Sequence, residues 1–135
     1  MIVLDCSAAI EIVERTEKGR ALQALMLSNE EVISVDLLCA ELTSVIRKHV
    51  IREEIAPQHA GRFLAAATGM VDRFVPAHEL EIETLNESVR LCHSPYDMFY
   101  FVLARRTGAT LFTTDEKLAT LAESNGVNTI SLATL

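Results

Sequence analysis

In the stretch MIVLDCSAAIEIV (residues 1–13), an apolar run ends in one acidic residue, and small residues follow it. Residues 2–5 (IVLD) predict a short buried strand, and we expect Ser7 to cap a helix that ends near Val13. Aspartate is a poor strand residue, and a buried carboxylate is costly unless something compensates it. Asp5 is therefore either a turn residue or part of a site.

The alternation of strand and helix continues along the chain. Further strands are expected at residues 31–35, 73–76, 109–112 and 128–131, and further helices at residues 18–27, 37–50, 58–71, 78–92, 95–106 and 115–124. This order predicts an α/β fold with a mainly parallel sheet and right-handed crossovers. Because no linker or low-complexity tract interrupts the pattern, we expect residues 1–135 to form a single domain.

Composition and charge narrow the class of protein. Half of the 135 residues are hydrophobic, and the three cysteines include no C-x-x-C pair, so neither disorder nor a disulfide framework is indicated. The apolar runs are too short for a membrane span and no secretory signal opens the chain, so we expect a cytoplasmic protein with no membrane partner. A net charge of −7 argues against a broad basic surface for nucleic acid, but not against a metal-assisted enzyme acting on a phosphodiester.

Two of the predicted strands are followed by an acidic residue. Asp5 ends the first strand, and Asp115 follows ATLFTT. In a parallel sheet both positions lie at the carboxyl edge, where ligands bind. Asp115 has an alternative explanation as the cap of the helix at 115–124, because aspartate is a preferred capping residue.

Two helices offer further carboxylates. Glu41 lies on the same face of its helix as the apolar residues Leu38 and Val45, which is an uncommon placement for an acid. It either belongs to a site or lies at the margin of the stripe and reaches water. Asp97 follows Ser94-Pro95 at the start of a nearly apolar helix, where a capping box explains it equally well.

The four carboxylates together suggest a metal site. Acids gathered on one edge repel each other unless a cation holds them, and oxygen ligands favour Mg²⁺ or Mn²⁺. The chemistry that fits is metal-assisted hydrolysis of a phosphodiester. Ser7 and Thr113 flank the acids, so their hydroxyls are candidates to orient a carboxylate or a bound water. Lys117, close to Asp115, is the candidate for a contact with a substrate phosphate.

The sequence resembles the PIN-domain nucleases, and in particular the VapC-type toxins of toxin–antitoxin pairs. The resemblance lies in MIVLDCSAAIEIV, SVDLLCAELTSVIRK and SPYDMFYFVLARRTGATLFTTDEKL, which occur in the family's order and span most of the chain. It implies a five-stranded parallel sheet flanked by helices and an acidic pocket for Mg²⁺ or Mn²⁺. It also implies an endoribonuclease that cuts RNA, forms homodimers and is held inactive by a cognate antitoxin.

The residue-by-residue match carries the family's catalytic and metal-binding acids onto Asp5, Glu41, Asp97 and Asp115, and its auxiliary hydroxyls onto Ser7 and Thr113. Residues 50–90 carry no motif of the family. A catalytically inactive metal-binding or protein-interaction module of the same fold is the alternative. A haloacid-dehalogenase-type phosphatase is disfavoured because Ser7 stands where its second acid is needed, and a receiver because its adjacent acids are missing.

Overall fold

The computed structural model describes residues 1–26 and 29–131. The sheet contains β1 (Ile2–Leu4), β2 (Val32–Val35), β3 (Arg73–Val75), β4 (Thr110–Phe112) and β5 (Thr129–Ile130). All pairings are parallel and the strand order is β3-β2-β1-β4-β5, which confirms the expected five-stranded parallel α/β sheet. In the central strand, Val3 pairs with Ile33 on one side and with Leu111 on the other.

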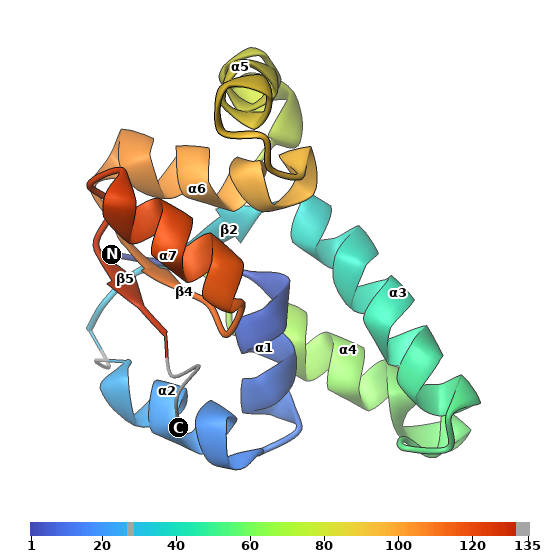
Figure 1. Ribbon diagram of the computed structural model, residues 1–135. Helices are drawn as coiled ribbons and strands as arrows, with labels where there is room; N and C mark the ends of the chain where they lie inside the picture. Colours follow the sequence, from blue (N-terminus) through green and yellow to red (C-terminus); the bar gives the residue numbers. More distant parts are fainter. Residues whose placement is uncertain (27–28, 132–135) are drawn as a thin grey trace.

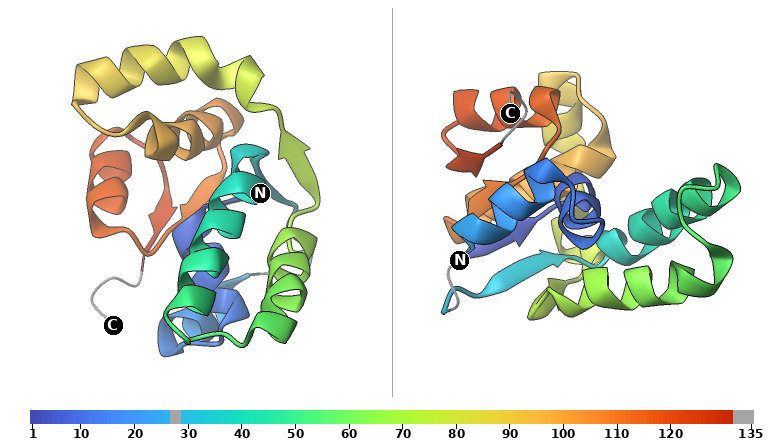
Figure 2. Two further views of the ribbon diagram at one scale, coloured as in Figure 1. Left: turned by 90° about the vertical axis from the view of Figure 1, so that its right-hand side faces the viewer. Right: turned by 90° about the horizontal axis from the view of Figure 1, so that it is seen from below.

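Helices cover both faces of this sheet. They are α1 (Cys6–Val13), α2 (Glu17–Leu25), α3 (Leu37–Ile51), α4 (Ala60–Gly69), α5 (Glu81–Leu91), α6 (Pro95–Thr107) and α7 (Glu116–Ser124). The helices α1 to α4 lie on one face and α5 to α7 on the other (Figure 1). This division follows from right-handed crossovers, because the strand order runs outward from β1 to β3 and then returns across β1 to β4 and β5. Figure 2 shows α3 and α4 lying side by side.

Each predicted strand and helix has a counterpart among the described residues, with shifts at the ends. Two predicted helices are preceded by 3₁₀ turns, at Pro57–His59 and Ala77–Leu80, so the α-helices themselves begin later than expected. The helix expected at 18–27 begins at Glu17 and ends at Leu25, and the last residue of that prediction lies outside the described residues. Gly108 ends α6 with a φ of 68°, the left-handed conformation expected for a helix-terminating glycine.

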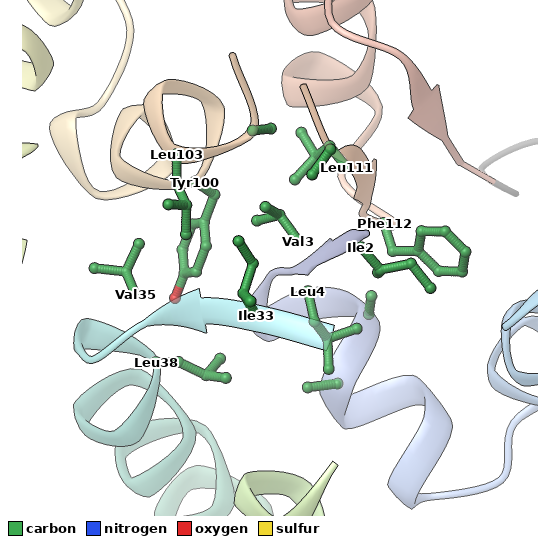
Figure 3. Packing of buried hydrophobic residues seen from close by; sticks show 14 of the residues in the cluster. Ile2, Val3, Leu4, Ile33, Val35, Leu38, Tyr100, Leu103, Leu111 and Phe112 are labelled. Atoms are coloured by element: carbon green, nitrogen blue, oxygen red, sulfur yellow. The ribbon is translucent and has the colours of Figure 1, made fainter. Parts of the chain in front are cut away.

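The core lies on both faces of the sheet, and α6 contributes more buried residues to it than any other described helix. Side chains of α6 from Met98 to Ala104 are almost all buried, as its apolar sequence predicts. Figure 3 shows Tyr100 reaching from α6 toward β2, where its ring lies among Val35 and Ile33 and its hydroxyl points away from its own helix. A helix buried on this scale holds its first turn in a fixed place, which positions Asp97.

Among residues 1–26 and 29–131, no helix has the length and apolar character needed to span a bilayer.

Candidate active site at the carboxyl edge of the sheet

The carboxyl ends of β1 and β4 open onto a cleft of about 390 Å³. Asp5 directly follows β1, and Asp115 follows β4 through two threonines. Glu41 enters the cleft from α3, and Asp97 enters it from the first turn of α6. The fold therefore brings together the four carboxylates that the sequence singled out, although the sequence separates the first from the last by most of the chain.

Asp5 is buried, with 4% of its surface exposed. Its carboxylate accepts the backbone N–H of Ala8 at 2.9 Å and the hydroxyl of Ser7 at 2.7 Å. Asp5, and not Ser7, is thus the N-cap of α1, which corrects the expected cap. The Ser7 hydroxyl is used elsewhere: it donates to the carboxylate of Asp5 and accepts the backbone N–H of Thr114, which follows β4.

Burial raises the pKa of Asp5 from 3.8 to about 6. Hydrogen bonds from Thr113, Ala8 and Ser7 lower the pKa but do not offset the loss of hydration, and the charge of Asp97 raises it further. The folded protein therefore holds a carboxylate that is costly to ionise. This is the electrostatic situation in which a bound cation lowers the free energy of the folded state.

Ser7 and Thr113 join the two strand ends. The Ser7 hydroxyl accepts the N–H of Thr114 at 2.9 Å and lies 3.2 Å from the hydroxyl of Thr113. Thr113, which is fully buried, accepts the N–H of Asp115 at 3.0 Å. These bonds fix the backbone that carries Asp115 relative to Asp5.

Asp115 caps α7, as its alternative explanation proposed. Its Oδ1 accepts the N–H groups of Lys117 at 2.9 Å and Leu118 at 3.2 Å. Both capping bonds use the same oxygen, and the residue also lines the cleft. Capping and a place in the site are therefore compatible.

Glu41 is half-buried and accepts the Tyr100 hydroxyl at 2.5 Å. Burial raises the pKa of Glu41, the Tyr100 hydrogen bond lowers it, and the charge of Asp97 raises it. Burial and the nearby Glu41 carboxylate also hold the pKa of Tyr100 far above its ordinary range, so the phenol remains a donor at every physiological pH. Tyr100 thereby fixes one oxygen of Glu41.

Replacing Tyr100 by Phe is expected to raise the pKa of Glu41 further, because the donor that favours its charged form is lost. The lost hydrogen bond to a charged group should also lower the free energy of unfolding at neutral pH by about 1–2 kcal/mol. Carboxyl ¹³C NMR titration measures the first effect and urea unfolding the second. Tyr96→Phe is the matched control on the same helix, because Tyr96 is 58% exposed. An unchanged Glu41 pKa in Tyr100→Phe contradicts this assignment.

Asp97 is held by a histidine and not by the expected capping box. Its Oδ2 lies 2.8 Å from His93 Nε2, and Ser94 makes no side-chain capping bond to the helix. The capping-box explanation of Asp97 is therefore wrong for this helix. The side chain of Asp97 is held by His93, which lies in the turn before the helix.

Several cleft residues escaped the sequence reasoning. Glu11 of α1, Glu14 just after it, His49 of α3, Cys6 and Tyr100 also line the cleft. A signal was present, because Ser7, Glu11 and Glu14 follow the spacing of one helix face, as do Glu41, Val45 and His49. The side chains of Glu14 and His49 are in hydrogen-bond contact across the cleft, through Oε1 and Nδ1. Burial, with the charges of Glu41 and Asp5, raises the pKa of the Cys6 thiol to about 12, so it stays protonated.

Lys117 does not line this cleft. It lines a separate hollow of about 870 Å³ together with His93, Glu116 and Glu123. Among the described residues that line the acidic cleft there are six carboxylates and neither lysine nor arginine. The cleft is therefore strongly acidic, and its wall offers neither a lysine nor an arginine to receive a phosphate.

Comparison with known proteins places this arrangement in a family. The family model described as "PIN domain" matches residues 2–124. The chain is 31% identical over 131 residues to Ribonuclease VapC12 of Mycobacterium tuberculosis, with 95% of each chain covered.

Solved structures agree on the fold. PAE2754 from Pyrobaculum aerophilum superposes with a TM-score of 0.73 at 18% identity, covering 98% of this chain and 90% of that one. Mycobacterium tuberculosis VapC20, described as a sarcin-ricin loop cleaving toxin, gives 0.69 at 17% identity, covering 94% and 96%. VapBC2 from Rickettsia felis, bound to a DNA fragment from its promoter, gives 0.69 at 14% identity, covering 97% and 98%. By its family model, its sequence relatives and its fold, this chain belongs to the PIN-domain family, among the VapC-type proteins.

Proposed function

We propose that this protein is an endoribonuclease that depends on Mg²⁺ or Mn²⁺ and acts as the toxin of a toxin–antitoxin pair. The observation that carries the proposal is the convergence of Asp5, Glu41, Asp97 and Asp115, from four separate elements, on one cleft. Its similarity to a protein named as a ribonuclease, at 31% identity over nearly the whole chain, supports RNA as the substrate.

The residues of the cleft fit a hard divalent cation. Carboxylate and hydroxyl oxygens are the ligands that Mg²⁺ and Mn²⁺ prefer, and burial has raised the pKa of Asp5 and of Glu41. Within residues 1–26 and 29–131, no three acidic, histidine or cysteine side chains are already spaced to hold an ion. We therefore expect Asp5, Glu41, Asp97 and Asp115 to adjust their side chains as they take up the metal.

A bound ion would supply the positive charge that the cleft wall lacks and would activate water for attack on phosphorus. The protein's own contribution is positional. Ser7 and Thr113 hold the Asp5 and Asp115 backbone segments together, and Tyr100 holds one oxygen of Glu41. The buried Asp5 provides charge in a place from which water is largely excluded, where electrostatic interactions are strongest.

Cleavage of RNA by the purified protein tests the proposal. We expect cleavage of single-stranded RNA with Mn²⁺ or Mg²⁺ and its loss when EDTA is added. Lack of cleavage with either metal, in a preparation that is folded by circular dichroism, contradicts the enzymatic function and leaves the non-catalytic module as the better account.

An antitoxin partner is part of the proposal. Support comes from the solved structures with the same fold, which include VapBC-1 from nontypeable Haemophilus influenzae, similar over 97% of this chain with a TM-score of 0.66. We expect a small protein from an adjacent reading frame to form a stable complex with this chain and to suppress its ribonuclease activity. Co-expression followed by purification through a tag on one partner measures both.

Self-association is the remaining part, and α5 offers a surface for it. Ile82, Leu85 and Val89 lie on one face of α5 at helical spacing and are 76%, 62% and 70% exposed. Tyr96, at the start of α6, is also exposed. A stripe of large apolar residues in water is typical of a surface covered by another protein. A second copy of this chain would bury it through an isologous contact.

Leu85→Glu is expected to convert the homodimer to a monomer, because the substitution puts a charge at the centre of the stripe in each copy. Light scattering coupled to size-exclusion chromatography measures the mass. Ile51→Glu is the control, since Ile51 is an equally exposed residue, at 61%, on α3. If wild type and Leu85→Glu have the same mass, the α5 stripe does not mediate self-association.

A further inference from the structure

We infer that His93 is a positioning residue for the metal site, acting through Asp97. The inference rests on the proposed function, because it assigns Asp97 a role as metal ligand. His93 precedes the stretch that resembles the family and was not among the candidate site residues. Its imidazole nevertheless makes the hydrogen bond of 2.8 Å between its Nε2 and the carboxylate of Asp97.

The direction of this bond follows from the form of Asp97 that binds a cation. A carboxylate in its ionised form has no proton to give, so in that form Nε2 carries the hydrogen and donates it to Asp97 Oδ2. One oxygen of Asp97 is thereby engaged by the imidazole, and the other remains for the cleft that Asp97 lines. Hydrogen bonds of this kind set the orientation of carboxylates that ligate metals.

The backbone that carries His93 is itself held firmly. The N–H of His93 donates to the carbonyl of Ser88 at 3.2 Å, and the Ser88 hydroxyl donates to the carbonyl of His93 at 2.6 Å. Cys92, between them, adopts a left-handed conformation with a φ of 50°, which is unfavourable for a residue other than glycine. The end of α5 thus turns the chain sharply and aims the imidazole at the first turn of α6.

His93 lies beside the acidic cleft and not in its lining. Its side chain is 17% exposed and lines the neighbouring hollow with Lys117, whereas Asp97 lines the acidic cleft. His93 reaches the cleft through the carboxylate that it holds. Without the imidazole, Asp97 would have to be ordered by the metal itself, and the loss of rotamer freedom would weaken metal binding.

Three variants of His93 and its support separate positioning from a general role in folding. His93→Phe keeps a planar ring but removes the donor, and His93→Gln places an N–H close to the position of Nε2. Ser88→Ala removes the hydroxyl that clamps the His93 carbonyl. Mn²⁺ binding, followed by electron paramagnetic resonance on the full-length protein, is the primary measurement, and Asp5→Asn provides the reference for a damaged site.

We expect His93→Phe to weaken Mn²⁺ binding by about 10- to 100-fold, the usual cost of losing a partner that orients a ligand. The Mn²⁺ affinity of His93→Gln should lie within about 3-fold of wild type, and that of Ser88→Ala should lie between those of His93→Gln and His93→Phe. Adding Ser88→Ala to His93→Phe should cause no further loss of affinity. Raising Mn²⁺ should restore RNA cleavage by His93→Phe, because its defect is in metal affinity; a folding defect would not respond.

One outcome would contradict the role of His93 and leave the proposed site intact. In that outcome wild type binds Mn²⁺ and Asp5→Asn does not, but His93→Phe binds Mn²⁺ at least as tightly as wild type. The role is also overturned if His93→Phe and His93→Gln both lose Mn²⁺ binding while both variants melt at the same temperature as wild type. If wild type itself binds no Mn²⁺, the proposed metal site and the role of His93 fall together.

Discussion

Asp5→Asn should abolish RNA cleavage and at the same time make the protein more stable at neutral pH. The carboxylate lies at the centre of the proposed metal site, and the amide cannot supply the charge that holds a divalent cation. We expect activity to fall at least about 100-fold, which exceeds the effect of losing a supporting residue around a metal ligand. Cleavage of a labelled RNA in Mn²⁺ gives the first measurement.

The gain in stability follows from the raised pKa of Asp5. Because burial raises the pKa from 3.8 to about 6, the folded state binds a proton more tightly than the unfolded state. The contribution of Asp5 to the free energy of unfolding is therefore undiminished below pH 3.8, falls as the pH rises through pH 6, and stays low above it. The full penalty at neutral pH is roughly 3 kcal/mol.

Asparagine carries no such penalty, so Asp5→Asn should raise the free energy of unfolding at pH 7.5 by about 1–3 kcal/mol. The buried amide N–H groups of asparagine need hydrogen-bond acceptors, and this requirement offsets part of the gain. Near pH 4 the two proteins should converge. Urea unfolding in EDTA across this pH range measures the effect. Glu123→Gln, which removes an exposed carboxylate of α7, should have the same free energy of unfolding as wild type. A variant less stable than wild type at pH 7.5 contradicts the raised pKa.

Gly19→Ala is expected to cause the largest loss of stability. A Cβ on Gly19 would lie 1.8 Å from the carbonyl oxygen of Glu11 and 2.7 Å from the nitrogen of Ile12, and both are backbone atoms of the α1 region. The chain cannot relieve this overlap by moving a side chain. Separation of α1 from α2 should cost at least about 3 kcal/mol, at the upper end of the range for overpacking and well above the gain of about 1 kcal/mol in helix propensity.

Urea unfolding also measures this loss, and Gly61→Ala is its control. No atom lies within 4 Å of a Cβ at Gly61, which is in α4. That variant should be unchanged or up to about 1 kcal/mol more stable, because alanine is the better helix former. Because α1 also carries Ser7 and is capped by Asp5, Gly19→Ala should reduce metal binding as well. Equal stability of the two alanine variants would rule out the close approach of α2 to α1.

The sequence predicted the fold well because each element carries its own signal. Buried apolar strands alternate with amphipathic or apolar helices, and this alternation leaves few topologies other than a parallel sheet. The convergence of Asp5 and Asp115 follows from that topology alone, because both follow strands whose carboxyl ends share an edge. Glu41 and Asp97 could be named as candidates, but only the packing of α3 and α6 brings them to that edge.

What the sequence did not predict depends on contacts between distant residues. Ser7 looked like the better cap for α1, but its hydroxyl joins Asp5 to the β4 side of the sheet, and Asp5 caps the helix. Tyr100 lies in a nearly apolar helix, whose sequence predicts no polar contact, and its bond to Glu41 spans 59 positions of sequence. Conversely, the signal for His93 was local, since it lies four positions before Asp97 in the sequence, yet a capping box already explained that aspartate.

The most direct test of the ribonuclease claim is to sequence the 5′ ends of RNA from cells that express wild type and from cells that express Asp5→Asn. The proposed function predicts new ends at defined positions in wild-type cells and their absence in the variant, which should be present at an equal or higher level because it is at least as stable. Identical profiles of 5′ ends in the two strains would contradict the claim that this acidic cleft cuts RNA.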